Sequence, residues 1–261
     1  MPLDLLITVP LGFGLGFLIG LTGVGGGALV APALYVILGL SYQDSVAVSL
    51  IYSVFTKIAG AAQHIRQGTV LWRVTLLYGL TGIPGAVVGS RAIYWFGDAA
   101  ERVLPFVMSG LLFGVALLIV MEAALRALAG RPKPFSPHEV TPVGVVVVAV
   151  YQTMVGVLMG MTSVGSGSLV ILSMLYLYRI TAREIVGSTI VIALLMVIPA
   201  GLTHYAVAGV SWSLLALLLL GSFLGAVLGA RVMLRIPERA LKVVIATLVV
   251  AAAAATLAKA W

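Results

Sequence analysis

Two glycine-rich segments contain the residues whose types and spacing are best suited to hold a solute. They are Thr22-Gly-Val-Gly-Gly-Gly27 and Thr162-Ser-Val-Gly-Ser-Gly-Ser168. Glycine adopts backbone angles that other residues resist, so each segment is expected to end one helix and open another, near Ala28 and Ser168. The first N–H groups of a helix lack internal partners and carry partial positive charge, so two such ends form a binding site for a small anion. The candidate substrate contacts are therefore Thr22, Gly23, Gly25, Gly26, Gly27, Thr162, Ser163, Gly165, Ser166, Gly167 and Ser168.

The alternative is that these glycines only permit close helix packing, as small residues at a spacing of four do in membranes. That explanation suits the regular spacing of Gly12, Gly16 and Gly20, or of Gly82, Gly85 and Gly89. It suits residues 23–27 less well, because four of those five residues are glycine.

Lys57 is the most informative single residue. It lies about 14 residues into a helix expected from residue 43, near the level of the glycine segment, with Ser53 and Thr56 one turn away. A charge inside a membrane is costly and usually functional, so Ser53, Thr56 and Lys57 join the candidate contacts for an anion. The alternative is that Lys57 extends to the inner interface, since His64 and Arg66 follow within three turns.

Two histidines end equivalent helices and are candidate gate or mouth residues. His64 and His204 could line the two openings of a path, or titrate during transport. We favour the alternative that they are interfacial residues beside Trp72 and Trp212. No residues are predicted to be catalytic or to bind a metal, and no cofactor is expected.

The composition requires a membrane around these residues. Hydrophobic residues make up 62% of the 261 and charged residues only 9%, whereas a soluble domain carries about 25% charged residues. Several apolar stretches approach the roughly 20 residues that span a bilayer. The net charge of +7 fits basic cytoplasmic loops rather than nucleic-acid binding. A cleaved signal peptide is unlikely with Asp4 at the N-terminus, and without cysteine there can be no disulfide.

The chain is built from two copies of one repeat. A shift of 140 residues superposes Gly16–Val30 on Gly156–Val170, with nine of fifteen positions identical. Polar and aromatic residues farther along also match at this offset: Asp44 with Glu184, His64 with His204, Trp72 with Trp212, and Arg91 with Arg231. The predicted domains are a first membrane repeat at 1–129, a proline-rich cytoplasmic linker at 130–141 and a second membrane repeat at 142–261.

The expected fold is an all-α polytopic membrane protein with two inverted repeats whose helices are interrupted at the glycine segments. Residues 5–38 would form a helix of about 51 Å, too long for one crossing of a ~30 Å core and short for two. A re-entrant hairpin fits better. The predicted helices are 5–21, 27–38, 43–64, 72–95, 101–127, 142–161, 167–178, 184–204, 212–235 and 238–258.

Charge favours this inverted topology. If neither hairpin crosses, the inner side carries eleven basic residues and the outer side three, namely Arg91, Arg102 and Lys259. If each hairpin segment crosses once, the halves are parallel and the split is eight to six. Basic loops lie preferentially in the cytoplasm, so both termini are predicted outside and the linker inside.

No carboxylate lies clearly within a predicted span: Asp44, Asp98, Glu101, Glu184 and Glu238 fall at helix ends, and Glu122 lies near one. Proton- and sodium-coupled carriers commonly use buried carboxylates. An inside-negative potential favours exit of an anion by about 2.3 kcal/mol per charge per 100 mV. We therefore expect uncoupled, electrogenic export.

Over nearly its whole length the sequence resembles the TauE/SafE family of sulfite exporter-like permeases. The residues that carry the resemblance are Gly16-x-x-x-Gly-Leu-Thr-Gly-Val-Gly-Gly-Gly27 with Pro32 after it, and the degenerate copy from Gly156 to Gly167. The resemblance implies an inner-membrane permease for sulfite, sulfoacetate or related organosulfur anions. Ser163 and Ser166 replace glycines of the motif, which makes the expected pocket asymmetric.

Three other functions compete with export of sulfite or a related organosulfur anion. The loops could offer carbonyl groups to a neutral or cationic solute, or the substrate could be another small inorganic anion. An intramembrane hydrolase would use Ser166 and His204, but Gly26 occupies the equivalent of Ser166 and no orienting carboxylate accompanies them. The expected partners are a small anion and the lipid bilayer, and the oligomeric state is unknown from sequence.

Overall fold

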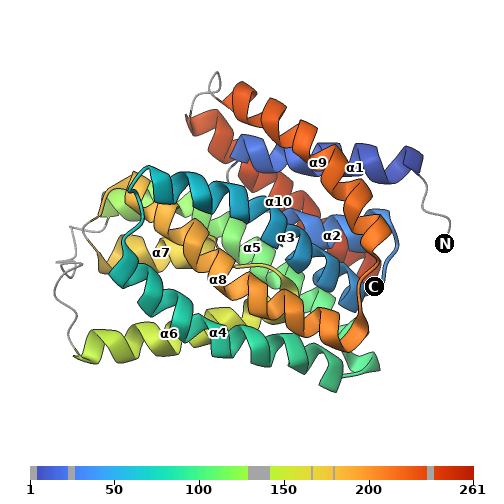
Figure 1. Ribbon diagram of the computed structural model, residues 1–261, viewed down its shortest axis with the longest axis horizontal. Helices are drawn as coiled ribbons and strands as arrows, with labels where there is room; N and C mark the ends of the chain where they lie inside the picture. Colours follow the sequence, from blue (N-terminus) through green and yellow to red (C-terminus); the bar gives the residue numbers. More distant parts are fainter. Residues whose placement is uncertain (1–4, 23–26, 129–141, 166, 179, 234–237) are drawn as a thin grey trace.

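The computed structural model describes residues 5–22, 27–128, 142–165, 167–178, 180–233 and 238–261. Within these ranges the protein is helical and contains no β-strand (Figure 1). The helices are α1 (Leu5–Thr22), α2 (Gly27–Ile37), α3 (Tyr42–Arg66), α4 (Trp72–Trp95), α5 (Asp98–Leu128), α6 (Pro142–Thr162), α7 (Ser168–Leu177), α8 (Ala182–Ala208), α9 (Trp212–Met233) and α10 (Glu238–Ala260). The linker predicted at 130–141 lies outside the described residues.

The helix ends follow from local chemistry. The hydroxyl of Ser41 accepts a hydrogen bond from the Asp44 amide and begins α3, and Thr181 and Glu184 form a reciprocal capping box at the start of α8. α8 continues four residues beyond the predicted end at His204, as far as Gly209, whose positive φ of 71° terminates it.

Six of the described helices are long and apolar enough to cross a membrane, which makes the protein a multi-pass membrane protein. These candidate spans are Tyr42–Arg66, Trp72–Trp95, Ala99–Leu117, Pro142–Thr162, Arg183–Ala208 and Trp212–Gly229. α6 is therefore long enough to span a bilayer by its length and composition, although the sequence assigned it to a re-entrant hairpin.

Glycines bring the first helix of each half against the fourth helix of the other half. A methyl group added at Gly16 of α1 would lie 2.2 Å from the carbonyl oxygen of Ser222 in α9. At the equivalent place, a methyl group added at Gly156 of α6 would lie 2.3 Å from the carbonyl oxygen of Gly82 in α4. The two helix pairs thus repeat the same contact at the offset of 140, and the packing role predicted for these spaced glycines is confirmed.

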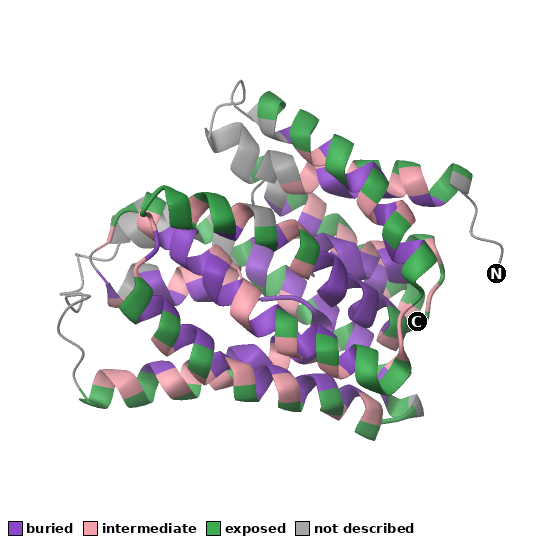
Figure 2. Ribbon diagram, viewed as in Figure 1, coloured by how far each residue is buried: buried purple, intermediate pink, exposed green. Residues whose placement is uncertain are grey.

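α3 and α8 cross in opposite directions at the centre of the molecule, between the two glycine-packed pairs (Figure 1). Gly60 of α3 faces Ile190 of α8, and Gly201 of α8 faces Ile51 of α3. Among the candidate spans, buried residues concentrate on these two helices (Figure 2). α5 and α10, the last helices of the two halves, also pack on each other.

The two halves differ in one packing contact. α4 packs on α8, with Leu195 and Met196 lying over Gly79 and Gly82. The equivalent pair, α9 and α3, touches at few points, among them the hydrogen bond between the hydroxyls of Tyr52 and Ser222. The α4–α6 pair is therefore held closely against the centre, whereas the α1–α9 pair is held loosely.

Candidate functional site

The second glycine segment reverses the chain between α6 and α7. α6 ends at Thr162 and α7 begins at Ser168. The hydroxyl of Tyr151, three turns back along α6, donates to the carbonyl oxygen of Leu169 at 2.9 Å. The first turn of α7 therefore lies beside the middle of α6, and residues 163–167 form the path between them.

Ser163 lies at the turning point and contacts the central helix α3. Its hydroxyl oxygen is 2.9 Å from that of Ser49, and both residues are almost completely buried. Its φ of 61° is a left-handed conformation that costs a residue with a side chain about 1 kcal/mol or more. The first repeat has glycine, Gly23, at the equivalent position. A strained serine with its hydroxyl on a central helix is typical of a functional site rather than of a plain turn.

The neighbours of Ser163 serve partly to hold the segment in place. The hydroxyl of Thr162 donates to the Leu158 carbonyl at 2.6 Å and accepts from the Val164 amide at 3.2 Å. Gly165 has a φ of 103° that favours glycine. Gly167 caps α7 without a side-chain hydrogen bond, and Ser168 opens the helix half-buried. Ser166 lies outside the described residues.

Only the residues on either side of the first glycine segment are described. α1 ends at Thr22, one residue beyond its predicted end, and α2 begins at Gly27, as predicted. Gly23, Gly25 and Gly26 lie outside the described residues, so the convergence of the two segments stays a prediction.

α3 presents a buried polar face that includes Lys57. Ser45, Ser49, Ser53 and Lys57 recur at every fourth residue, and Lys57 is only 7% exposed. No described residue forms a hydrogen bond or an ion pair with Lys57, and the buried hydroxyl of Ser53 has no partner among them either. Thr56, in contrast, donates to the carbonyl oxygens of its own helix at Tyr52 and Ser53. Lys57 and Ser53 are thus the polar groups of this face that are available to a solute.

Lys57 does not lie level with the second glycine segment. Ser49 contacts Ser163, and Lys57 follows Ser49 by two turns, about 12 Å along the helix axis. It lies instead close to the midpoint of the α3–α8 crossing, which Gly60 and Ile51 bracket.

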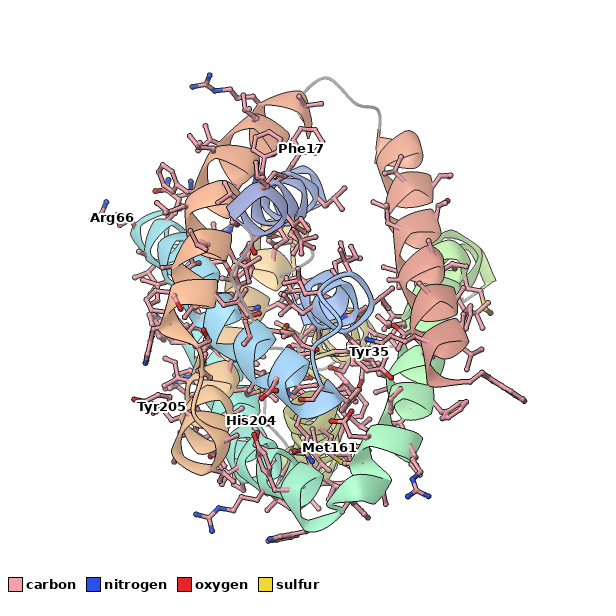
Figure 3. All side chains as sticks on the ribbon, turned by 90° about the vertical axis from the view of Figure 1, so that its right-hand side faces the viewer. Phe17, Tyr35, Arg66, Met161, His204 and Tyr205 are labelled. Carbon is pink, nitrogen blue, oxygen red and sulfur yellow. The ribbon has the colours of Figure 1, made fainter. Side chains whose placement is uncertain are left out.

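The two predicted gate histidines have different surroundings. His204 is fully buried, with Nδ1 2.7 Å from the Tyr94 hydroxyl and Nε2 3.0 Å from the Gly160 carbonyl oxygen. Because a carbonyl oxygen only accepts, Nε2 donates to it, and in the neutral ring Nδ1 accepts from Tyr94. His64 is half-buried and pairs with the Thr69 hydroxyl at 2.9 Å. Figure 3 shows His204 inside the bundle, whereas the next residue, Tyr205, points away from it.

His204 therefore joins the ends of three helices, α4, α6 and α8. Its partner in α6, Gly160, lies three residues before the turning point at Ser163. Within the described ranges, no three acidic or histidine side chains gather where they could hold a metal ion.

Sequence reasoning missed Ser49 and Tyr94. The spacing of Ser45, Ser49, Ser53 and Lys57 at every fourth residue was a usable signal, because it places all four on one helix face. Nothing in the sequence pairs Tyr94 with His204, since the two lie 110 residues apart on different helices.

Comparisons with known proteins agree with a transporter. The chain is 32% identical over 243 residues to the probable membrane transporter protein YjnA of Bacillus subtilis (strain 168), covering 92% of this chain and 94% of that one. It is 24% identical to the probable membrane transporter protein YdhB of the same strain, covering 88% and 91% of the two chains. A probable membrane transporter protein of Xylella fastidiosa (strain Temecula1 / ATCC 700964) is 28% identical over 192 residues, covering 72% of this chain and 69% of that one.

No solved structure matched the chain. The family described as "Sulfite exporter TauE/SafE" matches residues 8–256, nearly the whole sequence. Family, relatives and apolar helices agree, and the chain belongs to the TauE/SafE family of membrane transporters.

Proposed function

We propose that the protein exports a small organosulfur oxyanion, sulfite or a relative such as sulfoacetate, across the inner membrane by alternating access. The observation that carries the proposal is Lys57, a buried cation with no countercharge among the described residues. An isolated charge inside a membrane is expensive unless it binds something of opposite sign. The family description names sulfite, and sulfite and sulfonates present the oxyanion that a lysine and hydroxyl groups would bind.

The crossing of α3 and α8 supports an inverted arrangement of the two halves. Equivalent helices of parallel repeats run in the same direction, whereas those of inverted repeats run in opposite directions. α3 and α8 are equivalent at the offset of 140 and cross in opposite directions. The beginning of α1 and the end of α10 also lie on the same side of the molecule, at the right of Figure 1, and α6 begins on the other side.

We propose the corresponding topology of the protein in the membrane. Both termini lie outside, and the linker at 130–141 lies in the cytoplasm with most of the basic residues. The α1–α2 and α6–α7 segments are re-entrant hairpins in this topology, supported by the reversal that the bond from Tyr151 to Leu169 fixes. Reporter fusions at residue 135 should be active only inside the cell, and activity outside would overturn the topology.

A pseudo-twofold axis through the α3–α8 crossing would place Lys57 near the bilayer midplane. Substrate sites of inverted-repeat transporters lie there, at the repeat interface. The unequal packing of α4 on α8 and of α9 on α3 supports two exchangeable states, in which the tight and the loose contact change places. The solute would meet Lys57 in both states.

Transport is proposed to be uncoupled. Asp44 and Glu184 stand at the first turns of α3 and α8, and Glu101 accepts from the Tyr42 amide at 2.8 Å, so these carboxylates stabilise helix ends. The membrane potential alone would drive an anion outward.

The test is efflux of sulfite from proteoliposomes containing purified protein, at fixed pH with an imposed potassium-diffusion potential. Efflux should rise with the potential and should not change when a proton gradient is imposed at constant voltage. A thermal-shift panel of sulfite, sulfate, thiosulfate, phosphate and short sulfonates identifies the preferred anion. Stabilisation by cations or neutral solutes, but by no anion, would contradict the proposal.

A further inference from the structure

A second group of polar side chains is buried without partners, on the side of α4 and α6 where these helices begin. The hydroxyls of Thr75 and Tyr78 and the Oε1 atom of Gln152 form no hydrogen bond within the described part of the chain. All three residues are 0% exposed. Burial of an unpaired polar group is unfavourable, and inside a membrane no bulk water relieves it.

Four helices meet around these groups. The Gln152 amide nitrogen of α6 lies 3.9 Å from the sulfur of Met196 in α8, a weak contact. The ring of Tyr78 in α4 is tilted against that of Tyr178, which follows α7, with centroids 6.2 Å apart. The hydroxyl of Ser173 in α7 donates to the Val170 carbonyl oxygen of its own helix at 2.9 Å and lies beside the Tyr78 hydroxyl. We call Tyr78, Gln152 and Ser173 the tyrosine–glutamine cluster.

The fold does not need polar groups at these positions. The residues equivalent at the offset of 140 are Leu218 for Tyr78, Gly12 for Gln152 and Ala33 for Ser173. Gly12 of α1 packs directly on the backbone of Leu218 in α9, so the equivalent helix pair forms without polar side chains at these two positions. The polarity of the cluster therefore serves something other than helix packing.

The cluster lies on the linker side of the loop that joins α6 to α7. Gln152 precedes Ser163 by eleven residues, about 16 Å along the helix. It also lies at the contact between α4 and α8, because Met196 covers Gly82 and approaches Gln152. That contact is tight, and its equivalent between α9 and α3 is loose. If the tight α4–α8 contact and the loose α9–α3 contact changed places, α4 and α6 would separate from α8 and the cluster would be uncovered.

We infer that Tyr78, Gln152 and Ser173 form a second, uncharged contact site for the transported oxyanion, occupied when α4 and α6 separate from α8. This inference rests on the proposed function. The Tyr78 hydroxyl and the Gln152 amide donate to the oxyanion, and the Ser173 hydroxyl does so when it leaves the Val170 carbonyl. Oε1 of Gln152 accepts from water that accompanies the ion. Neutral donors bind an anion more weakly than Lys57 does. The cluster lies at nearly the same depth as Lys57, about 16 Å against about 12 Å from the Ser49–Ser163 contact, so the site holds the ion beside Lys57 on the side of α4 and α6.

The absence of cysteine makes the site directly testable. Ser173→Cys places one thiol in the cluster. Ser109→Cys is the matched control, because Ser109 is also buried and also bonds a carbonyl of its own helix, at Pro105 as Ser173 does at Val170, but it lies in α5, which contributes no residue to the cluster. Vesicles of both orientations are treated with 2-sulfonatoethyl methanethiosulfonate, an anionic sulfonate reagent. We expect Ser173→Cys to react at least tenfold faster than the control from the linker side, and sulfoacetate to slow this reaction at least threefold. Slow reaction, or fast reaction without protection, would overturn the inference.

Sulfite efflux from the unmodified protein, measured in matched proteoliposomes, separates the two proposals. An unmodified protein without efflux refutes the proposed function, whereas efflux combined with an unprotected thiol refutes only the second site. Tyr78→Phe gives an independent measurement, because it removes a hydroxyl that has no protein partner. Efflux should fall about fivefold while the melting temperature does not fall, and a lower melting temperature with normal efflux would assign Tyr78 a structural role.

Discussion

α3 and α8 occupy equivalent places in the two halves, yet only α3 carries a continuous polar face through the centre of the molecule. That face contains Ser45, Ser49, Ser53 and Lys57, and the equivalent residues of α8 are Ile185, Thr189, Ala193 and Val197. Both sets are buried and both helices pack at the same crossing. Packing therefore does not require the polar side chains of α3, and their presence indicates a solute.

In the tyrosine–glutamine cluster the polar residues belong mainly to the second half, and their apolar equivalents to the first. This distribution is the reverse of that on α3 and α8. The two copies therefore share a helix scaffold but differ in which buried positions are polar. One lysine on a pseudo-twofold axis can serve both sides of the membrane, so a second charge at Val197 would add only desolvation cost. The comparison teaches that the binding site is asymmetric even though the scaffold is duplicated.

The strongest test of this difference between α3 and α8 is to remove the charge of Lys57. Lys57→Ala should lower sulfite efflux by about 100-fold or more, because loss of one partner of a buried charge pair costs about 3 kcal/mol. Thermal stability should be unchanged or higher, since the variant no longer buries an unpaired charge. Val197→Ala is the matched control and should transport normally. Normal efflux by Lys57→Ala would remove the lysine from the site.

The glycine-packed pairs test whether the scaffold itself is symmetric. Methyl groups added at Gly85 and at Gly225 would each lie 2.0 Å from a carbonyl oxygen, of Thr153 and of Phe13 respectively. Gly85→Ala and Gly225→Ala should therefore destabilise the protein alike, by about 2–3 kcal/mol. Gly110→Ala is the control, since nothing lies within 4 Å of the added methyl group. Melting temperatures measured in detergent check this, and unequal losses would show that one pair carries more of the stability.

Much of this scaffold could be predicted from the sequence, because it depends on local patterns. Apolar runs and caps place the helices, and glycines at every fourth residue mark the close contacts of α1 with α9 and of α4 with α6. The candidate site was less predictable. The sequence pointed to Lys57 and Ser163, but the contact of Ser163 with Ser49 depends on how distant helices cross. That crossing is set by the sum of many packing contacts, and no single residue pattern encodes it.

The two equivalent histidines extend the comparison. His204 is fully buried with a partner at each ring nitrogen, whereas His64 is half-buried with its partner five residues away. His204→Ala leaves the Tyr94 hydroxyl and the Gly160 carbonyl unpaired and should cost about 1–3 kcal/mol. His64→Ala should cost less than about 1 kcal/mol, because its partner Thr69 also bonds the backbone at His64. Equal losses in thermal unfolding would contradict the different roles of the two residues.

The smallest effect concerns one hydroxyl, and it measures the asymmetry most directly. Ser53→Ala removes a buried hydroxyl that has no partner among the described residues, so protein stability should not fall. If that hydroxyl donates to the anion beside Lys57, KM for sulfite efflux should rise about fivefold, about 1 kcal/mol, with kcat little changed. At the equivalent position of α8, Ala193→Ser adds a hydroxyl that no charged side chain accompanies. This variant should leave KM unchanged. A lower KM in Ala193→Ser would mean that the anion contacts both central helices, and the site would then be as symmetric as the scaffold.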